Sequence, residues 1–304
     1  MHTALSPDNP HGFNRYGFAW EKVPAGGPAH LDFGCFDGKF LDSLGGRGVV
    51  RRVGVDISRD AVAEAGRLRP HLEVIHITRS VPLPFADGTF SSVSALDVIE
   101  HIVEQAALLD EFHRVLRPGG VLIVTVPGQH LFSALDAGNF KFRFPQLHRW
   151  YYCRRHSREE YERRYVSNPD GLVGDVSAAK RWHEHFSRDR LTRLLAQSGF
   201  AVTDFDGTSF FGRPLSLLRL AVGPLRPLRR AMDRLLLADA RRFESMNLFC
   251  AAERRDSPCV VPPSSGCRAA LTNARLPPLP RSEGLARGHG DEGNPCVFTG
   301  RMPI

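Results

Sequence analysis

The feature that most constrains the fold is an alternation of short apolar runs with helical patterns between residues 29 and 127. Short apolar runs separated by amphipathic stretches are typical of strand–helix–strand units with parallel strands. Such units are joined by right-handed crossovers and build an α/β fold around one sheet. The expected strands are the runs at 29–33, 49–56, 71–77, 91–99 and 121–127.

The region after residue 184 returns to a regular pattern. The stretch 185–200, HFSRDRLTRLLAQSGF, predicts a helix that begins at the N-cap residue Ser187 and ends at Gly199. The runs at 201–207 and 245–254 predict two further strands, which brings the expected sheet to seven.

The remaining segments suggest how the domain is organised. An aromatic, basic and irregular stretch at 128–182 is expected to be a lid inserted over the carboxyl edge of the sheet, where open α/β sheets bind ligands. The last part is rich in Pro, Gly, Ser and Arg without periodicity, so we expect it to be disordered. The predicted parts are an N-terminal extension (1–28), the domain (29–255) with the lid (128–182) and a helical basic insertion (208–243), and the tail (256–304).

The stretch HLDFGCFDGKF, residues 30–40, ends a buried strand with a carboxylate and a glycine turn. Glycine lets the backbone turn tightly and lets a ligand approach the main chain. A carboxylate at Asp32 suits a cationic or hydrogen-bond-donating ligand better than a pyrophosphate. Asp56 ends the next strand, where a carboxylate suits the two hydroxyls of a ribose. The turn therefore predicts a nucleoside site with a cationic part.

Four stretches in this order carry a resemblance to a known family: LDFGCFDG, VGVD, PLPFADGTFSSVSALDVIEHI and EFHRVLRPGGVLIVTVP. They resemble the successive motifs of class I S-adenosylmethionine-dependent methyltransferases. The resemblance implies a Rossmann-like, doubly wound sheet of seven strands, mostly parallel with an antiparallel last strand. It also implies S-adenosylmethionine as the cofactor.

The resemblance assigns roles to single positions. Asp32, Gly34 and Gly38 would line the methionine part of the cofactor, and Cys35 lies in the same turn. Asp56 would accept from the ribose hydroxyls, with Ile57 packing on the adenine. Leu96 and Asp97 would face the sulfonium and the acceptor. The implied cofactor-binding residues are Asp32, Gly34, Cys35, Gly38, Asp56, Ile57 and Leu96.

Two departures from the family pattern concern cofactor binding. Phe36 stands where the family has its middle glycine. An acidic residue that commonly follows the third strand is absent, and Thr78, Arg79 and Ser80 occupy that place. Adenine recognition would then rest on main-chain and apolar contacts.

The candidate catalytic residues are less sharply defined, because a sulfonium already activates its methyl group and the enzyme mainly positions the acceptor and removes a proton. We predict His148, within the lid, as the base, with His101 and Asp97 as further candidates. The other candidates are His130, His183, His185 and Glu100. Asp97, Glu100 and His101 could together hold a divalent metal, but we favour a site without metal because this pattern is common in metal-free relatives.

The net charge of +7 comes from 40 basic and 33 acidic residues. Eight arginines lie between residues 213 and 242, with leucines at helical spacing. A basic amphipathic segment of this kind suits an anionic membrane surface; the alternative is an ordinary helical subdomain that packs on the lid or forms a dimer. The six cysteines form no C-x-x-C pair, so neither a zinc site nor a disulfide framework is indicated.

The function that we predict is methyl transfer to an O, N or C atom of a small-molecule, glycan or lipid-linked acceptor in a biosynthetic pathway. A nucleic-acid methyltransferase is the first alternative, although no RNA-binding motif is visible. The others are a non-catalytic cofactor-binding protein and a nicotinamide-dependent oxidoreductase, whose phosphate loop would need G-x-G-x-x-G. The start lacks the pattern of a secretory signal and no run reaches about 18 apolar residues, so we expect a cytoplasmic protein.

Overall fold

In this computed structural model the described residues are 13–136, 139–167, 184–221 and 226–255. The predictions for the tail at 256–304 and for His183 lie outside these ranges.

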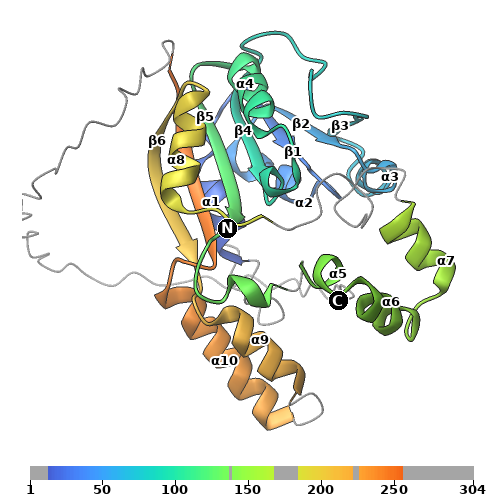
Figure 1. The fold of residues 1–304 in the computed structure, drawn as a ribbon. Coiled ribbons are helices and arrows are strands. Elements are labelled where there is room, and N and C mark those ends of the chain that lie inside the picture. Colours follow the sequence, from blue (N-terminus) through green and yellow to red (C-terminus); the bar gives the residue numbers. More distant parts are fainter. Residues whose placement is uncertain (1–12, 137–138, 168–183, 222–225, 256–304) are drawn as a thin grey trace, which may run out of the picture. The chain divides into compact units, whose positions relative to one another are not determined.

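Seven strands form one sheet in the order β3-β2-β1-β4-β5-β7-β6 (Figure 1). Neighbouring strands from β3 to β5 are parallel, and β7 runs antiparallel to both β5 and β6. The strands are β1 (Ala29–Phe33), β2 (Arg51–Asp56), β3 (Glu73–His76), β4 (Phe90–Leu96), β5 (Leu116–Pro127), β6 (Phe200–Thr208) and β7 (Asn247–Arg254). The predicted mostly parallel sheet with an antiparallel last strand is confirmed.

The helices connect these strands and cover both faces of the sheet. The α-helices are α1 (Phe13–Lys22), α2 (Lys39–Ser43), α3 (Arg59–Leu68), α4 (Gln105–Val115), α5 (Phe140–Arg143), α6 (Pro145–Cys153), α7 (Arg158–Tyr161), α8 (Arg188–Gln197), α9 (Gly212–Ala221) and α10 (Arg226–Arg242). Short 3-10 turns lie at Leu44–Arg47, Ile99–His101 and Ser133–Leu135, and a π-helical turn lies at Glu162–Val166. The predicted N-cap is confirmed, since the Ser187 hydroxyl accepts from the Arg190 N–H at 3.2 Å.

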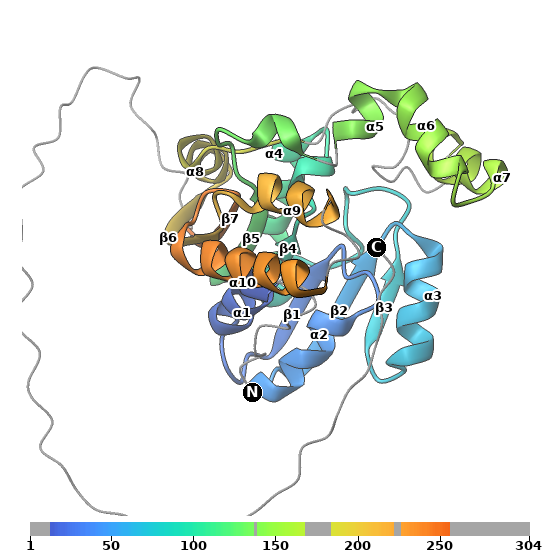
Figure 2. The same cartoon turned by 90° about the horizontal axis from the view of Figure 1, so that it is seen from below.

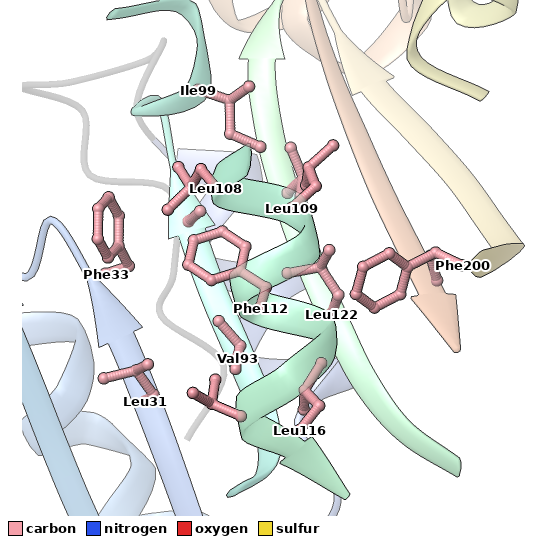
Figure 3. Close-up of a cluster of buried hydrophobic side chains, with 14 of the residues drawn as sticks. Leu31, Phe33, Val93, Ile99, Leu108, Leu109, Phe112, Leu116, Leu122 and Phe200 are labelled. Atoms are coloured by element: carbon pink, nitrogen blue, oxygen red, sulfur yellow. The ribbon is translucent and has the colours of Figure 1, made fainter. Parts of the chain in front are cut away.

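Two apolar clusters lie on opposite faces of the sheet, because alternate residues of a strand point to opposite sides. Leu31 and Phe33 of β1 belong to the larger cluster, in which α4 packs on the sheet through side chains such as Phe112 (Figure 3). The second cluster joins α1 and α2 to the sheet around Phe40 and Phe249. Figure 2 shows α1 and α2 on the side of the sheet away from α4 and α8. The intervening residues His30 and Asp32 are also fully enclosed, although they are polar.

The first described helix, α1, lies in the segment that the sequence sets apart as an N-terminal extension. Phe18 and Ala19 of α1 and Val23, which follows it, are buried in the second cluster together with Ile123 and Phe249 of the sheet. The described part of this segment is therefore packed on the sheet and covers part of one of its faces.

The lid segment, predicted as irregular, forms short helices in its described part. The ring of His148 contacts the rings of Phe140, Tyr152, Tyr161 and Tyr165, with centroid distances from 4.8 to 6.1 Å. These rings are mostly half-buried and pack around the buried Tyr161, so aromatic contacts hold the short helices of this segment together.

Between β6 and β7 the chain forms the helical hairpin α9–α10, as the predicted insertion at 208–243 requires. Arg219 of α9 donates to Asp233 of α10 at 2.6 Å, and Asp239 accepts from the main-chain N–H of Phe211 at 2.9 Å. These contacts join the two helices and fasten α10 to the end of β6. In the part of the chain that the structure describes, every helix is too short or too polar to cross a membrane.

Candidate functional site

The turn after β1 brings the main chain of two strands together. Gly34 has a φ of 78°, and its N–H donates to the carbonyl of Val55 at 2.8 Å. A Cβ at Gly34 would lie 2.5 Å from Cγ2 of Val98, which is closer than real Cβ atoms approach. Glycine is therefore required here both by the left-handed backbone and by the neighbouring side chain.

Asp56 at the end of β2 holds this turn in place. One of its carboxylate oxygens accepts from the Phe36 N–H at 2.9 Å, and the other accepts from the Ser58 N–H at 2.9 Å. Because Ser58 caps α3, the carboxylate links the turn after β1 to the start of α3. Asp56, which the sequence predicts to bind the ribose hydroxyls, therefore also stabilises the turn.

Phe36 adopts a backbone conformation that is costly for its residue type. Its φ is 48°, in the left-handed region where a residue with a side chain is strained by about 1–2 kcal/mol. Its side chain is 64% exposed, so the ring gains little from burial. The geometry explains why a glycine is common at this position in the family that the sequence resembles.

Cys35 and Gly38 complete the turn. The Gly38 N–H donates to the Cys35 carbonyl at 2.8 Å, and Gly38 has a φ of 75°. The Cys35 thiol points into the protein, since a Cβ at Gly54 would lie 2.6 Å from its sulfur. Burial, reinforced by the charges of Asp32 and Asp56, raises the pKa of the thiol well above its usual range. Cys35 thus shapes the turn with its main chain, and its thiol stays protonated.

Asp32 is the buried carboxyl group of the site. It is 3% exposed and accepts a hydrogen bond from the Ser94 hydroxyl at 2.6 Å. Burial raises its pKa to about 7, partly offset by the Ser94 hydrogen bond and increased by the negative charge of Asp56. Among the described residues, no cationic side chain forms an ion pair with Asp32. A cation placed beside such a carboxyl group stabilises its ionised form.

Asp97 lies at the end of β4, again with a left-handed φ, of 56°. Its N–H donates to the Thr125 carbonyl at 2.9 Å, and its carboxylate accepts from the Thr125 hydroxyl at 2.7 Å. The same carboxylate forms an ion pair with Arg15 of α1. Asp97 is therefore held on two sides, and a role as a base would have to compete with the Arg15 charge.

The other two predicted catalytic residues lie in different surroundings. His101 ends a 3-10 turn, with its Nε2 3.8 Å from Oε1 of the fully buried Glu100. The ring contacts shown for His148 are all with lid residues, and its Nδ1 lies 3.5 Å from the Tyr161 hydroxyl. Burial, followed by the charge of Lys141, lowers the pKa of His148. Within the described ranges, no group of three or more His, Cys, Asp or Glu side chains is arranged to hold a metal.

A second polar cluster, which the sequence did not group together, lies beyond the carboxyl end of β5. Its members are His130, Asp136, His185 and Arg213, and we call it the His185 cluster. Nε2 of His185 lies 2.9 Å from Oδ2 of Asp136 and 3.0 Å from a guanidinium nitrogen of Arg213. Another guanidinium nitrogen lies 3.2 Å from Nε2 of His130. Burial, then Arg213 and His185, lowers the pKa of His130 to about 4, so this imidazole is neutral at pH 7.

The position of the His185 cluster follows from main-chain pairing at the end of β5. The Phe186 N–H donates to the Pro127 carbonyl at 2.8 Å, and the Gln129 N–H donates to the Phe186 carbonyl at 2.8 Å. His185 is thereby held at the same edge of the sheet as Asp97, which bonds to Thr125 of β5. The sequence groups Arg213 with the other arginines of the basic insertion, but its side chain is only 11% exposed and lies in this cluster.

Residues 15–204 match the family model described as a methyltransferase domain. A probable S-adenosylmethionine-dependent methyltransferase of Mycolicibacterium smegmatis is 36% identical over 104 residues, which are 34% of this chain and 39% of that protein. A ubiquinone biosynthesis O-methyltransferase of Psychrobacter cryohalolentis is 28% identical over 117 residues, which are 35% of this chain and 45% of that protein. The chain thus spans less than half the length of these curated relatives.

The fold is also similar to a chain of the complex between the Haloferax volcanii Trm112 methyltransferase activator and a methyltransferase. The TM-score is 0.51 at 18% sequence identity, and the match covers 79% of this chain and 89% of that chain. At this identity the likeness concerns the fold alone.

The strain at Phe36 generates a prediction about stability. Replacing Phe36 with glycine removes the left-handed penalty and adds the entropy cost of a glycine in the unfolded chain, so we expect a net gain of roughly 0.5–1 kcal/mol. Urea unfolding followed by circular dichroism measures it. The matched control Phe36→Ala loses the ring but keeps the strain, and it should show no gain. Equal loss of stability in both variants would contradict the prediction.

Proposed function

Because the chain belongs to the methyltransferase domain family, we propose that it transfers the methyl group of S-adenosylmethionine to an oxygen atom of a small-molecule acceptor. The family match over residues 15–204 is the observation that carries the proposal. The choice of oxygen is supported by the relative named as a ubiquinone biosynthesis O-methyltransferase.

The residues around the turn after β1 fit the parts of this cofactor. Asp32 offers a buried carboxyl group without a protein cation, which suits the ammonium group of the methionine part. Asp56 is 9% exposed, and each of its oxygens, which accepts one N–H, has a second lone pair for a ribose hydroxyl. Gly34 and Gly38 keep the main chain of the turn open, with Ile57 and Leu96 as the proposed apolar contacts.

The sulfonium, when bound, supplies an activated methyl group. The residues of the chain then have to orient the acceptor hydroxyl and take its proton. We propose His185 for this proton. In the neutral ring Nε2 accepts from the Arg213 guanidinium at 3.0 Å, because a guanidinium only donates, and the Nε2–H of the imidazolium can then donate to Asp136 at 2.9 Å. Asp136 would also stabilise the imidazolium that forms.

The three residues predicted from sequence remain candidates of lower rank. The aromatic contacts of His148 support a role in positioning the lid. Asp97 is ion-paired with Arg15, and His101 lies beside Glu100. His185 combines an imidazole with a carboxylate oxygen of Asp136 at 2.9 Å.

The experiment that tests the function uses the full chain with methyl-labelled cofactor and a panel of phenols, hydroxy acids and amines. We expect calorimetric binding of S-adenosylhomocysteine and label transfer to hydroxyl compounds. Asp56→Asn should weaken the binding at least tenfold, because the ribose hydroxyls lose an ionised acceptor. Binding without label transfer to any compound would favour a cofactor-binding protein, and no binding would contradict the proposal.

A variant pair tests the proposed base. His185→Gln should lower kcat by roughly 10²–10⁴-fold, the usual contribution of a general base, while the dissociation constant of S-adenosylhomocysteine stays the same. The control His148→Gln should change KM more than kcat, since it alters the lid. The base is misassigned if His148→Gln lowers kcat and His185→Gln leaves it unchanged.

We further propose that the α9–α10 hairpin rests on an anionic membrane surface, which would give access to a lipid-linked acceptor. Leu217 and Leu218 of α9 and Leu228 and Leu235 of α10 are exposed. The exposed arginines of α10 include Arg229, Arg230, Arg234, Arg241 and Arg242. Both acids of the hairpin are engaged, Asp233 by Arg219 and Asp239 by main-chain N–H groups. The exposed charge is therefore positive, as anionic headgroups require.

Vesicle flotation tests the membrane contact. The wild-type chain should float with phosphatidylglycerol vesicles and not with phosphatidylcholine vesicles, and a variant with Arg229, Arg230 and Arg234 changed to Glu should lose this binding. A control with the same change of charge at the exposed Arg79, Arg117 and Arg193 should keep it. Light scattering tests the alternative that the hairpin forms a dimer interface. A dimer that the arginine variant abolishes, together with no flotation, would overturn the membrane proposal.

A further inference from the structure

A chain of four buried polar side chains lies on one face of the sheet, next to the proposed cofactor site. Its members are Ser92, His30, Ser94 and Asp32, and we call it the Asp32 relay. Ser92 Oγ lies 2.8 Å from Nδ1 of His30, Nε2 of His30 lies 2.9 Å from Ser94 Oγ, and Ser94 Oγ lies 2.6 Å from Oδ1 of Asp32. All four residues are at most 3% exposed.

The register of two neighbouring strands creates this chain. In the pairing of β1 with β4, His30 lies opposite Ser92 and Asp32 lies opposite Ser94. The four side chains therefore share one face of the sheet, where apolar residues would otherwise pack around Phe40. The buried His30 imidazole has hydrogen-bond partners on both nitrogens. Through Ser94 it therefore fixes the geometry of the Asp32 carboxyl group.

The hydrogen positions follow when Asp32 is ionised. A carboxylate only accepts, so the single hydrogen of the Ser94 hydroxyl points to Asp32. The Ser94 oxygen then accepts from His30, which places the imidazole hydrogen on Nε2. Nδ1 of His30 is left as an acceptor for the Ser92 hydroxyl. Burial lowers the pKa of His30 to about 3, so the ring is neutral and can hold only one of the two hydrogens.

The opposite arrangement follows when Asp32 is protonated. Its hydroxyl can donate to Ser94, the Ser94 hydroxyl can donate to Nε2 of His30, and the imidazole hydrogen then lies on Nδ1, pointing to Ser92. The two arrangements differ by one proton on Asp32 and by the tautomer of His30.

We infer that the Asp32 relay positions the Asp32 carboxylate for the ammonium group of S-adenosylmethionine and reverses its hydrogen bonds when Asp32 changes its ionisation. Cofactor binding then favours the ionised arrangement, and the proton of Asp32 is released to water. His30 and Ser94 are positioning residues, since they act through Asp32. The inference rests on the proposed role of Asp32 in cofactor binding.

The surroundings of Asp32 place the coupling between its ionisation and cofactor binding near neutral pH. Burial raises the pKa of Asp32 to about 7, and Asp56 on the neighbouring β2 adds to the rise. In the turn, the Cys35 thiol is held protonated, and Asp37 lies near Arg69, with 3.9 Å between Oδ2 and the guanidinium. At the end of β4, Asp97 is paired with Arg15. A cofactor cation would lower the pKa of Asp32, so binding should strengthen as the pH rises through about 7 and release protons below that pH.

The tautomer of His30 is the direct test, because a purely structural imidazole would not change it. In the apo protein, nitrogen-15 NMR should show hydrogen on Nδ1 at pH 5.5 and on Nε2 at pH 8.5. Saturating S-adenosylhomocysteine at pH 7 should give the Nε2–H form, and Asp32→Asn should abolish the pH dependence. One unchanged tautomer under all these conditions would overturn the inference. The apo measurement needs no ligand, so it still decides the relay if the proposed cofactor does not bind.

Two matched pairs of variants test the positioning role. Ser94→Ala should weaken S-adenosylhomocysteine binding about tenfold, the loss expected from one charge-assisted hydrogen bond, and raise the pH midpoint of binding. Ser92→Ala loses a bond to the same imidazole and should change the midpoint less. His30→Gln can still donate to Ser94 and should bind better than His30→Asn, whose shorter amide reaches toward Ser92. Equal pH midpoints in the serine pair, together with equal binding in the His30 pair, would contradict the inference.

Discussion

The hydrogen bonds that Asp56 accepts from Phe36 and Ser58 are the constraint on which the site depends. They tie the turn after β1 to the first residues of α3, and the Gly34 N–H adds a bond to the Val55 carbonyl. A turn held in this way keeps its main chain open at the carboxyl edge of the sheet, where a nucleoside can approach. The strained φ of Phe36 is accepted because this N–H has a buried carboxylate as its partner.

Three carboxyl groups lie around this turn, each supplied by a different strand or by the residue that follows it. Asp32 near the end of β1, Asp56 at the end of β2 and Asp97 directly after β4 lie at the same edge of three adjacent strands, yet their surroundings differ. Asp56 accepts from main-chain N–H groups, Asp97 is paired with Arg15, and Asp32 has a neutral relay behind it. The three carboxyl groups therefore have three different kinds of partner, because these partners come from different elements.

Much of the fold and part of the site could be predicted from the sequence, since these depend on local patterns. The strand periodicity, the Ser187 cap and the glycines of the turn act over a few residues. Sequence patterns predict less well the surroundings of side chains whose partners are far away in the sequence. Its position in the sequence groups Arg213 with the other arginines of the basic insertion, whereas in the structure it lies in the His185 cluster. The sequence favours His148 as the base because of its aromatic neighbours, and the structure shows these rings in contact with one another. A signal for the Asp32 relay was present, because His30, Ser92 and Ser94 are polar residues in strands that otherwise read as apolar.

The sequence by itself determined the family, the order of strands and helices, and the residues of the turn, because each is written in contiguous motifs. Only the tertiary structure decided which carboxylates have cationic partners and which imidazoles have carboxylate or hydroxyl partners. Arg15 and Asp97 are 82 positions apart, and His30 and Ser94 are 64 apart. Contacts of this kind depend on strand register and on how helices pack against the sheet, and no local pattern in the chain encodes them.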